Sequence, residues 1–280
     1  MFVIIGATGT IGREVVTQLR ATGTAVTAVT RDPGQARMPR GTVVVGADPS
    51  VPSIPAETWD DVEGVLLSSR AIIASAPEIL SAALDHGARR VVVISASTIE
   101  HPAGEPRFVA GFRALEAAAE ASGLAWTSLR CADFDANTLA WAPQLRAGDV
   151  VRGAYGKAAT SPIHERDIAA VAVRALTEDG HAGRHYLLTG PEALTQYDKV
   201  RILGELTGRD LSFLELTADQ VRAGMRAQGL PEEVPARLLG SLSDYARVPG
   251  PTTGTVAELL GRPALDFATW AAEHAAAFTR

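Results

Sequence analysis

The stretch MFVIIGATGTIGREVVTQL (residues 1–19) decides the fold of this 280-residue chain. Five apolar residues run directly into three glycines spaced three apart, Gly6, Gly9 and Gly12, and a helical pattern follows. In a strand–loop–helix unit that binds a dinucleotide, the first glycine lets the backbone turn and the second leaves room for the pyrophosphate. The third glycine lets the helix pack closely on the strand, and the helix amino end offers N–H groups to the phosphates. The spacing is GxxGxxG rather than GxGxxG, but the strand before it and the helix after it favour a bound dinucleotide over a vestigial loop.

Beyond this unit, apolar runs alternate with helical patterns through the first two-thirds of the chain. The runs predict strands at residues 2–5, 25–30, 42–45, 62–67, 90–95, 125–130 and 185–189. The helical patterns lie at residues 12–21, 76–86, 109–122 and 165–177. Buried strands that are separated by helices pair in parallel through right-handed crossovers. The sequence therefore predicts an α/β protein with a doubly wound parallel sheet, an NAD(P)-binding Rossmann fold.

The chain changes character near residue 190, where helical segments separated by Gly and Pro replace the alternation. We expect a dinucleotide-binding domain over residues 1–190 and a smaller, mostly helical substrate-binding part over residues 191–280. The irregular, Gly-rich stretch 131–162 is expected to contribute loops to the substrate site at the carboxyl ends of the strands.

The composition of the chain argues against some kinds of binding partner and some locations. The net charge is −6 and basic residues are not clustered, which argues against nucleic-acid binding. Apolar runs fall short of the roughly 18 residues that a membrane helix needs. The chain starts in a strand rather than a basic leader, and its single cysteine, Cys131, fits a reducing compartment, so we expect a cytoplasmic protein. The six histidines show no metal-ligand spacing, and we expect no metal site.

The end of the second strand bears on the choice of coenzyme. Folds that select NAD usually carry a carboxylate there to bind the ribose hydroxyls. Here Thr30 takes that place and Arg31 follows, and a guanidinium can pair with a 2′-phosphate. Asp32, one residue further on, keeps NAD open as an alternative. We expect NADP(H) to be preferred over NAD(H).

At this point the sequence resembles a known family, the atypical short-chain dehydrogenases called NmrA-like. The resemblance rests on the Thr30–Arg31 pair and on the stretches GATGTIGREV, VVVISAS, LEAAAEASGLAWTSLR, FDAN, SPIHERDIAAVAVRAL, YLLTGPEALT and LLGRPALDFATWAAEHAAAF, which together cover nearly the whole chain. It implies a Rossmann domain with a smaller helical part, and a preference for NADP(H). Members include quinone and enone reductases and regulatory proteins that sense NADP without turning it over.

The resemblance also implies which residues form the site. The cofactor would be lined by Gly6, Thr8, Gly9, Thr10, Ile11, Gly12 and Arg31, with Ser68, Ser69 and Ser95 near the nicotinamide ribose. Phe134 and Asn137 would lie on the loop that faces the nicotinamide and the substrate.

Ordinary short-chain dehydrogenases use a Tyr-x-x-x-Lys pair, in which the ammonium lowers the tyrosine pKa and the phenol protonates the product alkoxide. The chain has two lysines, and the residues four positions before Lys157 and Lys199 are Gly153 and Thr195, so this pair is absent. Aligned on Glu116 and the turn after it, the chain has Phe108 in place of the tyrosine and Phe112 in place of the lysine. Many NmrA-like proteins keep a histidine or lysine at the second position, so this chain departs from its family there.

Three functions stay open. The first is reduction by NADPH of a quinone or conjugated carbonyl, which needs little acid catalysis and draws protons from water. The second is an NADP sensor, and the third is a non-redox cyclase, isomerase or lyase. We favour the reductase, with a small apolar or aromatic substrate held by Phe108, Phe112, Phe134 and Trp141. Hydrogen-bond donors to that substrate are expected among Ser97, Thr98, Asn137 and Tyr155. A homodimer is compatible with this reading.

Other polar residues have plainer interpretations. His101 is expected in solvent, and His164 in a structural or ribose-contacting role. Asp133 and Asp135 flank Phe134 and are expected to be solvated, because only burial would raise a carboxyl pKa enough for acid–base work. Cys131 is expected to pack as a small apolar residue.

Overall fold

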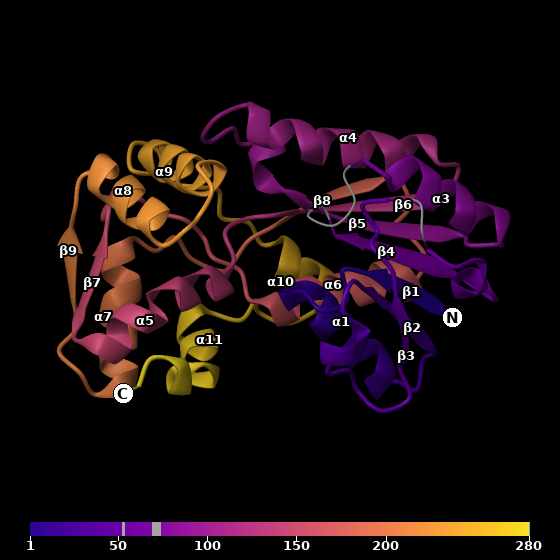
Figure 1. The fold of residues 1–280 in the computed structure, drawn as a ribbon, viewed down its shortest axis with the longest axis horizontal. Helices are drawn as coiled ribbons and strands as arrows, with labels where there is room; N and C mark the ends of the chain where they lie inside the picture. Colours follow the sequence, from indigo (N-terminus) through magenta and orange to yellow (C-terminus); the bar gives the residue numbers. More distant parts are fainter. Residues whose placement is uncertain (52–53, 69–73, 280) are drawn as a thin grey trace. The chain divides into compact units, whose positions relative to one another are not determined.

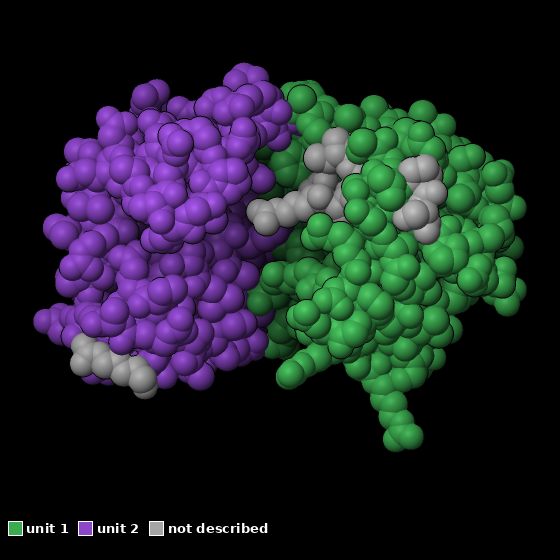
Figure 2. All heavy atoms as spheres, in the orientation of Figure 1, with its two compact units in different colours: residues 1–99, 110–131, 165–187 green, residues 100–109, 132–164, 188–280 purple. Residues whose placement is uncertain are grey.

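The chain folds into two compact units. The computed structural model describes residues 1–51, 54–68 and 74–279. Unit 1 comprises residues 1–99, 110–131 and 165–187, and unit 2 comprises residues 100–109, 132–164 and 188–280 (Figure 2). Neither unit is one continuous stretch of chain.

Unit 1 is built on a seven-stranded sheet with the order β3-β2-β1-β4-β5-β6-β8. Its strands are β1 (Phe2–Ile5), β2 (Val26–Thr30), β3 (Val43–Gly46), β4 (Gly64–Ser68), β5 (Arg90–Ala96), β6 (Ala125–Cys131) and β8 (Arg184–Leu188). The five pairings from β3 to β6 are parallel. β8 runs parallel to β6 as well, because Gly183 N–H donates to Trp126 O and Ala132 N–H donates to Leu188 O. The prediction of a doubly wound parallel sheet is confirmed.

Helices cover both faces of this sheet, which explains why its central strands read as unbroken apolar runs. α1 (Thr10–Ala21) and α6 (Glu165–Thr177) lie on one face, and α3 (Ala76–Asp85) and α4 (Arg107–Ala121) lie on the other (Figure 1). Alternate strand residues point to opposite faces. Val3, Ile5, Val65, Leu67, Val91 and Val93 therefore form one core with apolar residues of α3 and α4.

The strand order reverses next to β1. The chain builds β2 and β3 on one side of β1 and then crosses to β4 on its other side. In open α/β sheets, ligands bind outside the carboxyl ends of the strands at such a switch point. The three-glycine loop begins at the carboxyl end of β1, and Ser68 ends β4.

Unit 2 is mostly helical. It contains the 3₁₀ helix η4 (Asp135–Trp141), α5 (Ala142–Ala147), α7 (Gln196–Thr207), α8 (Ala218–Ala227), α9 (Glu233–Tyr245), α10 (Thr255–Leu260) and α11 (Phe267–Glu273). Its core gathers Leu145, Val151, Leu203, Phe267 and Trp270, all at most 1% exposed. A two-stranded parallel sheet joins β7 (Val150–Gly153) to β9 (Ser212–Glu215).

Three features differ from the expectation. The stretch 131–162, expected to be irregular, contains η4, α5 and β7, and β9 adds a strand to a region expected to be helical. Residues 132–164 also group with the carboxyl-terminal segments rather than with the sheet. Among the described residues, no helix has the length and apolar character needed to cross a membrane.

Candidate functional site

The glycine loop at the carboxyl end of β1 is shaped by close backbone approaches. Gly6 has a φ of +81°, a conformation that side chains disfavour. A Cβ added at Gly12 would lie 2.3 Å from the carbonyl oxygen of Gly6 and 2.9 Å from Cα of Ala7. A Cβ at Gly9 would lie 3.2 Å from the same oxygen. The loop is therefore folded so tightly on itself that its glycines have little room for side chains.

The folded loop places backbone amide groups at the amino end of α1. The helix begins at Thr10 with Gly9 as N-cap, no side chain caps it, and its first backbone bond runs from Arg13 N–H to Gly9 O. The amides of Thr10, Ile11 and Gly12 precede that bond, as the first N–H groups of any helix do. Thr8, Gly9 and Thr10 are exposed while Ile11 and Gly12 are buried. Such a helix start suits an anionic diphosphate.

The neighbouring strand brings the residues expected to select the coenzyme to the loop. The Thr30 hydroxyl at the end of β2 lies 3.3 Å from the Thr8 hydroxyl. Arg31 follows and is exposed. Asp32 Oδ1 accepts a hydrogen bond from the amide of Gln35 at 3.2 Å, which caps the 3₁₀ turn Pro33–Gln35. One carboxylate oxygen of Asp32 is thus already used within its own turn.

The serines expected near the nicotinamide ribose have different surroundings. Ser68 ends β4 and is half-buried, while Ser69 lies outside the described residues. Ser95 is 3% exposed and lies opposite Arg130 in the β5–β6 register. Its hydroxyl lies close enough to Glu116 to contribute to lowering the pKa of that carboxyl.

Glu116 is the centre of a buried polar cluster between α4 and the sheet. Its carboxylate accepts hydrogen bonds from Arg130 (2.8 and 3.1 Å) and from Ser128 (2.6 Å). Burial by itself raises the pKa of Glu116, but the hydrogen bonds from Arg130 and Ser128 outweigh it and bring that pKa below its usual value. His185 lies 3.6 Å from Glu116 and 3.5 Å from Glu120, so these three are a possible ligand group for a cation. The Arg130 guanidinium already neutralises the Glu116 carboxylate, which makes the cluster an ion-pair anchor for α4.

The two phenylalanines that replace the Tyr–Lys pair lie one turn apart on α4. Phe108 and Phe112 are half-buried, and residues four apart in a helix share a face. The Arg107 guanidinium carbon lies 4.5 Å from the centre of the Phe108 ring. Neither ring can transfer a proton.

A second polar cluster lies in unit 2, in the segment that follows β6. Asp133 accepts hydrogen bonds from Lys199 Nζ (3.1 Å), from Thr160 Oγ1 (3.2 Å) and from Asn137 Nδ2 (2.6 Å). Lys199 also donates to Thr160 Oγ1 at 3.1 Å and is only 3% exposed. Asn137, expected to donate to a substrate, therefore already donates one of its two N–H groups to Asp133.

The expectation that both aspartates are solvated is wrong. Asp135 is 0% exposed, and its amide donates to Ile163 O at 3.1 Å. Phe134 is half-buried and forms a backbone bridge with Ile163, so this segment is fixed by pairing rather than left as a free loop. His164 is completely buried with Nε2 3.4 Å from Glu273, while His101 is exposed as expected.

The remaining candidates are spread over both units. Ser97 is buried and Thr98 half-buried in the 3₁₀ turn Ser97–Ile99 of unit 1. Tyr155 of unit 2 is half-buried and has a φ of +58°, rare for a residue with a side chain. Trp141 packs against the core of unit 2, with its ring 6.4 Å from that of Phe213. Cys131 is buried as expected, and burial raises the pKa of its thiol.

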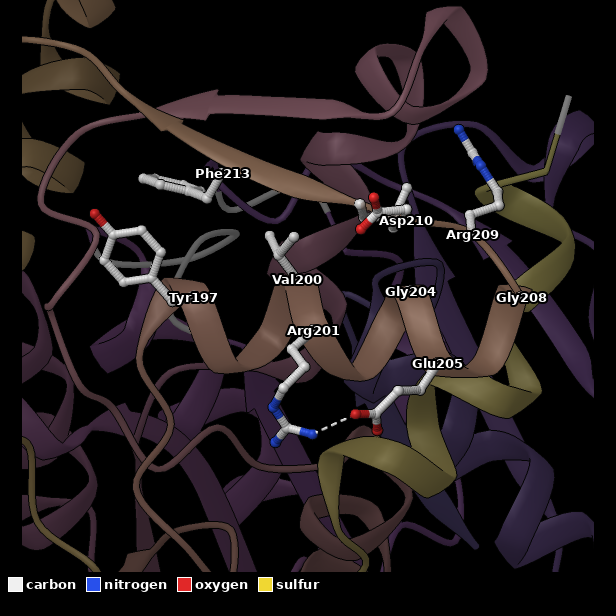
Figure 3. A pocket seen from close by; sticks show the side chains of 10 residues that line it. Tyr197, Val200, Arg201, Gly204, Glu205, Gly208, Arg209, Asp210 and Phe213 are labelled. Atoms are coloured by element: carbon white, nitrogen blue, oxygen red, sulfur yellow. Dashed lines mark hydrogen bonds and ion pairs between the residues drawn. The ribbon is translucent and has the colours of Figure 1, made fainter.

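Unit 2 also has a surface hollow of about 380 Å³ beside α7 (Figure 3). Both arginines that line it are already paired, since Arg201 donates to Glu205 at 2.7 Å and Arg209 donates to Asp149 at 2.6 and 2.8 Å. Tyr197 and Phe213 form its apolar end. The hollow contains none of the residues predicted for the site.

Sequence reasoning missed Lys199, although a signal was present. The buried positions of α7 include Gln196, Val200 and Leu203, and Lys199 lies in the same helical stripe. A lysine on the apolar face of a helix requires a buried partner. The sequence does not say that Asp133, 66 positions earlier, is that partner.

Known proteins resemble this chain over its whole length. Residues 6–179 match the model of a family described as NAD(P)H-binding. The chain is 37% identical to (4-alkanoyl-5-oxo-2,5-dihydrofuran-3-yl)methyl phosphate reductase of Streptomyces griseus over 99% of both chains. It is 31% identical to an NAD(P)H azoreductase of Xenophilus azovorans, also over 99% of both. The crystal structure of an NADPH-dependent quinone oxidoreductase of Escherichia coli in complex with NADPH superimposes with a TM-score of 0.83 at 25% identity, covering 98% of this chain and 99% of that one.

These relatives are reductases, and they confirm the prediction of an NAD(P)H-dependent oxidoreductase over the sensor and the non-redox enzyme. The matched region contains the glycine loop, the strands β2 and β4, and the helix α4 that carries Phe108 and Phe112. The chain belongs to the NAD(P)H-binding family of atypical, NmrA-like reductases.

Proposed function

We propose that the protein uses NADPH to reduce a small conjugated carbonyl compound, either an α,β-unsaturated ketone or lactone or a quinone. Hydride from the nicotinamide would add to the β carbon of the conjugated system, and the electron pair of the double bond would move onto the carbonyl oxygen as an enolate. Water would then protonate the enolate at the α carbon. For a quinone, hydride and one proton give the hydroquinone.

The observation that carries this proposal is the pair of phenylalanines on α4. Reduction of an isolated ketone gives an alkoxide that must take a proton as it forms, and the Tyr–Lys pair serves that step. Phe108 and Phe112 cannot serve it. An acceptor whose reduced anion is stabilised by its own conjugation needs only hydride transfer from a well-positioned nicotinamide.

The named substrate of the Streptomyces griseus relative has this property. One carbon of its ring double bond carries both the ring carbonyl and the alkanoyl carbonyl, so hydride addition at the other carbon gives an anion shared between two oxygens. The quinone of the Escherichia coli relative belongs to the same electronic class. We therefore place this chain's substrate among strongly polarised conjugated carbonyls.

For the coenzyme we propose a preference for NADPH. Arg31 is exposed directly after β2, and Asp32 is partly engaged by the amide of Gln35. A guanidinium at this place supplies charge for a 2′-phosphate that NADH lacks.

The proposal is tested by binding and turnover measured on the same preparation. NADPH at one hundred times its dissociation constant should stabilise the folded chain by about 2.7 kcal/mol, which is visible as a rise in melting temperature. NADPH absorbance should then fall on addition of a simple quinone or a 2-acyl butenolide, and stay constant with a saturated ketone of similar size. Turnover of the saturated ketone at a comparable rate would contradict the reading of Phe108 and Phe112.

Arg31→Ala tests the coenzyme preference. The variant should weaken NADPH binding by about ten- to one-hundredfold, as loss of a charged hydrogen bond to phosphate implies, and leave NADH nearly unchanged. An equal loss for both nucleotides would show that Arg31 does not contact the 2′-phosphate.

A further inference from the structure

Arg13 has no role in the scheme above, although it lies in the first turn of α1, directly after the glycine loop. The residue is exposed, and its guanidinium donates to two backbone oxygens, Thr8 O at 3.4 Å and Arg37 O at 3.2 Å. Within the part of the chain that the structure describes, no carboxylate forms an ion pair with it. Arg13 therefore brings a positive charge to the loop that no described residue neutralises.

The two oxygens that Arg13 contacts border the position that selects the coenzyme. Thr8 belongs to the glycine loop, and its hydroxyl lies 3.3 Å from that of Thr30. Thr30 stands where NAD-selecting folds carry the carboxylate that binds the ribose. From Arg31 the chain passes through one 3₁₀ turn and reaches Arg37. The segment thus leaves the ribose-selecting position and returns to the guanidinium of Arg13.

Arg31 alone is a weak match for a phosphate monoester. Such a group carries a charge of about −1.5 to −2 at pH 7. The pKa of Asp48 is lowered mainly by hydrogen bonds from Ser50 and, to a smaller extent, by the charge of Arg31. Part of the charge of Arg31 is thus directed at a carboxylate of the protein. A 2′-phosphate at this place would need a second cation.

The guanidinium of Arg13 is prepared for that task. A guanidinium has five N–H donors in one rigid plane. Two of them are used on the carbonyls of Thr8 and Arg37, so three remain. The carbonyls restrain the side chain before any ligand binds, which reduces the entropy lost on binding. A planar fork of charged donors is also the group that recognises phosphate most specifically.

We propose that Arg13 is a second specificity-determining residue for the 2′-phosphate of NADPH. It would approach the phosphate from α1, while Arg31 approaches it from the end of β2. The hydroxyls of Thr8 and Thr30 and both arginines belong to unit 1, so the site is formed within one compact unit. The inference rests on the proposed preference for NADPH and names a residue, outside the expected coenzyme site, that enforces it.

The test compares ligands that differ in the 2′-phosphate. Arg13→Met removes the charge and keeps an unbranched side chain. Calorimetry with the variant should show NADPH and adenosine 2′,5′-bisphosphate binding about tenfold more weakly than with the wild type, because one charged hydrogen bond to phosphate is lost. Binding of NADH should stay nearly unchanged. An equal loss for NADPH and NADH would show that Arg13 only clamps the loop, and an unchanged affinity for NADPH would show that it makes no contact; either result overturns the proposal.

Arg20 provides a matched control on the same helix. It also donates to two backbone oxygens, Thr24 O at 2.7 Å and Arg40 O at 3.4 Å. It lies seven residues after Arg13, about 10 Å further along the axis of α1. Arg20→Met should lower the melting temperature at least as much as Arg13→Met and leave the ratio of NADPH to NADH affinity unchanged. If Arg20→Met changes that ratio as much as Arg13→Met does, the effect comes from loosening α1 and the proposal fails.

Phosphorus NMR of bound NADPH observes the contact directly. Two neighbouring cations favour the dianion, so the second pKa of the bound 2′-phosphate should lie below the value of about 6 that is usual for a phosphate monoester. In Arg13→Met this pKa should rise toward that value. The same pKa in both chains would refute the contact.

These results also separate the inference from the proposals on which it rests. A wild type that binds NADPH and NADH equally would refute the coenzyme preference and the role of Arg13 together. A wild type that prefers NADPH through Arg31, with Arg13→Met unchanged, would refute the role of Arg13 alone. None of the measurements requires turnover, so a failure to reduce any conjugated carbonyl would refute the reductase proposal and leave the role of Arg13 standing.

Discussion

At the scale of single residues, the glycine loop is determined by contacts that only backbone can make. Gly12 lies in the first turn of α1, where alanine would ordinarily be the better helix former. Its α carbon instead faces the Gly6 carbonyl, and a methyl group there would come within 2.3 Å of that oxygen. The nearest atoms that this methyl group would meet all belong to the backbone of Gly6 and Ala7, so no side-chain movement can relieve the clash.

Gly12→Ala should therefore destabilise the chain by about 1–3 kcal/mol or more, and it should reduce the rise in melting temperature caused by NADPH. Gly224→Ala is the matched control, because Gly224 lies inside α8 and a Cβ there would meet nothing within 4 Å. That control should gain about 0.5–1 kcal/mol from helix propensity. Thermal unfolding with and without NADPH measures both; equal effects of the two alanines would contradict the steric account.

Some residues of the candidate site could be predicted from the sequence and others could not. The glycines were predicted because the loop, its strand and its helix are contiguous, so their spacing is visible in the chain. The Lys199–Asp133 pair joins positions 66 apart, and no local pattern links them. Asp135 was misjudged for the same reason, since its burial comes from the pairing of its segment with Ile163.

At the scale of elements, α4 is tied to the sheet by the Glu116 cluster. Leu115 and Ala119 supply the apolar part of that contact, and both are 0% exposed. Glu116 adds hydrogen bonds to Arg130 and Ser128 of β6. The same helix carries Phe108 and Phe112.

Glu116→Gln should lower the free energy of unfolding at neutral pH by about 2–3 kcal/mol, because Arg130 loses its charged partner. The folded pKa of Glu116 lies below its usual value of 4.5. A carboxyl with a lowered folded pKa stabilises above its unfolded pKa, and the contribution is lost as pH falls through the folded value. The difference between the wild type and the variant should therefore shrink as pH falls below about 4.5.

Glu120→Gln serves as the control, because Glu120 is exposed and its ion pair with His185 spans 3.5 Å. It should change stability by a few tenths of a kcal/mol. Denaturant unfolding from pH 3 to pH 7 measures all three chains. A wild-type advantage over Glu116→Gln that stays constant over that range would contradict the role of the ionised carboxyl.

Elements were predictable where burial gives them a regular pattern. The seven strands of the central sheet are apolar runs flanked by helices, and each was placed to within a few residues. β7 and β9 were missed because each is four residues long, each is only partly buried, and they pair across about sixty positions. Short strands of that kind carry almost no periodic signal.

At the scale of the whole molecule, the chain passes between the two units five times, after residues 99, 109, 131, 164 and 187. A division at residue 190 was expected because the sequence changes character there. The compact units are defined instead by which residues contact one another, and each combines segments that are distant in the sequence. Leu145 and Val151 of the middle segment share a core with Leu203 and Trp270 of the carboxyl-terminal segment. Cutting the chain at residue 190 would remove most of that core.

A fragment of residues 1–190 should therefore fail to fold as a native domain, although it contains every strand of the central sheet. Its segment 132–164 would expose Leu145 and Val151, which are 0% exposed in the full chain, and an exposed apolar patch of this kind promotes aggregation. The expected signs are a broad unfolding transition, binding of a hydrophobic dye and rapid proteolysis within residues 132–164. A chain ending at residue 278 keeps Phe278, removes only Thr279 and Arg280, and should melt as the full chain does. A sharp transition of the 1–190 fragment that shifts upward with NADPH would show instead that the sheet folds and binds coenzyme without the carboxyl-terminal segments.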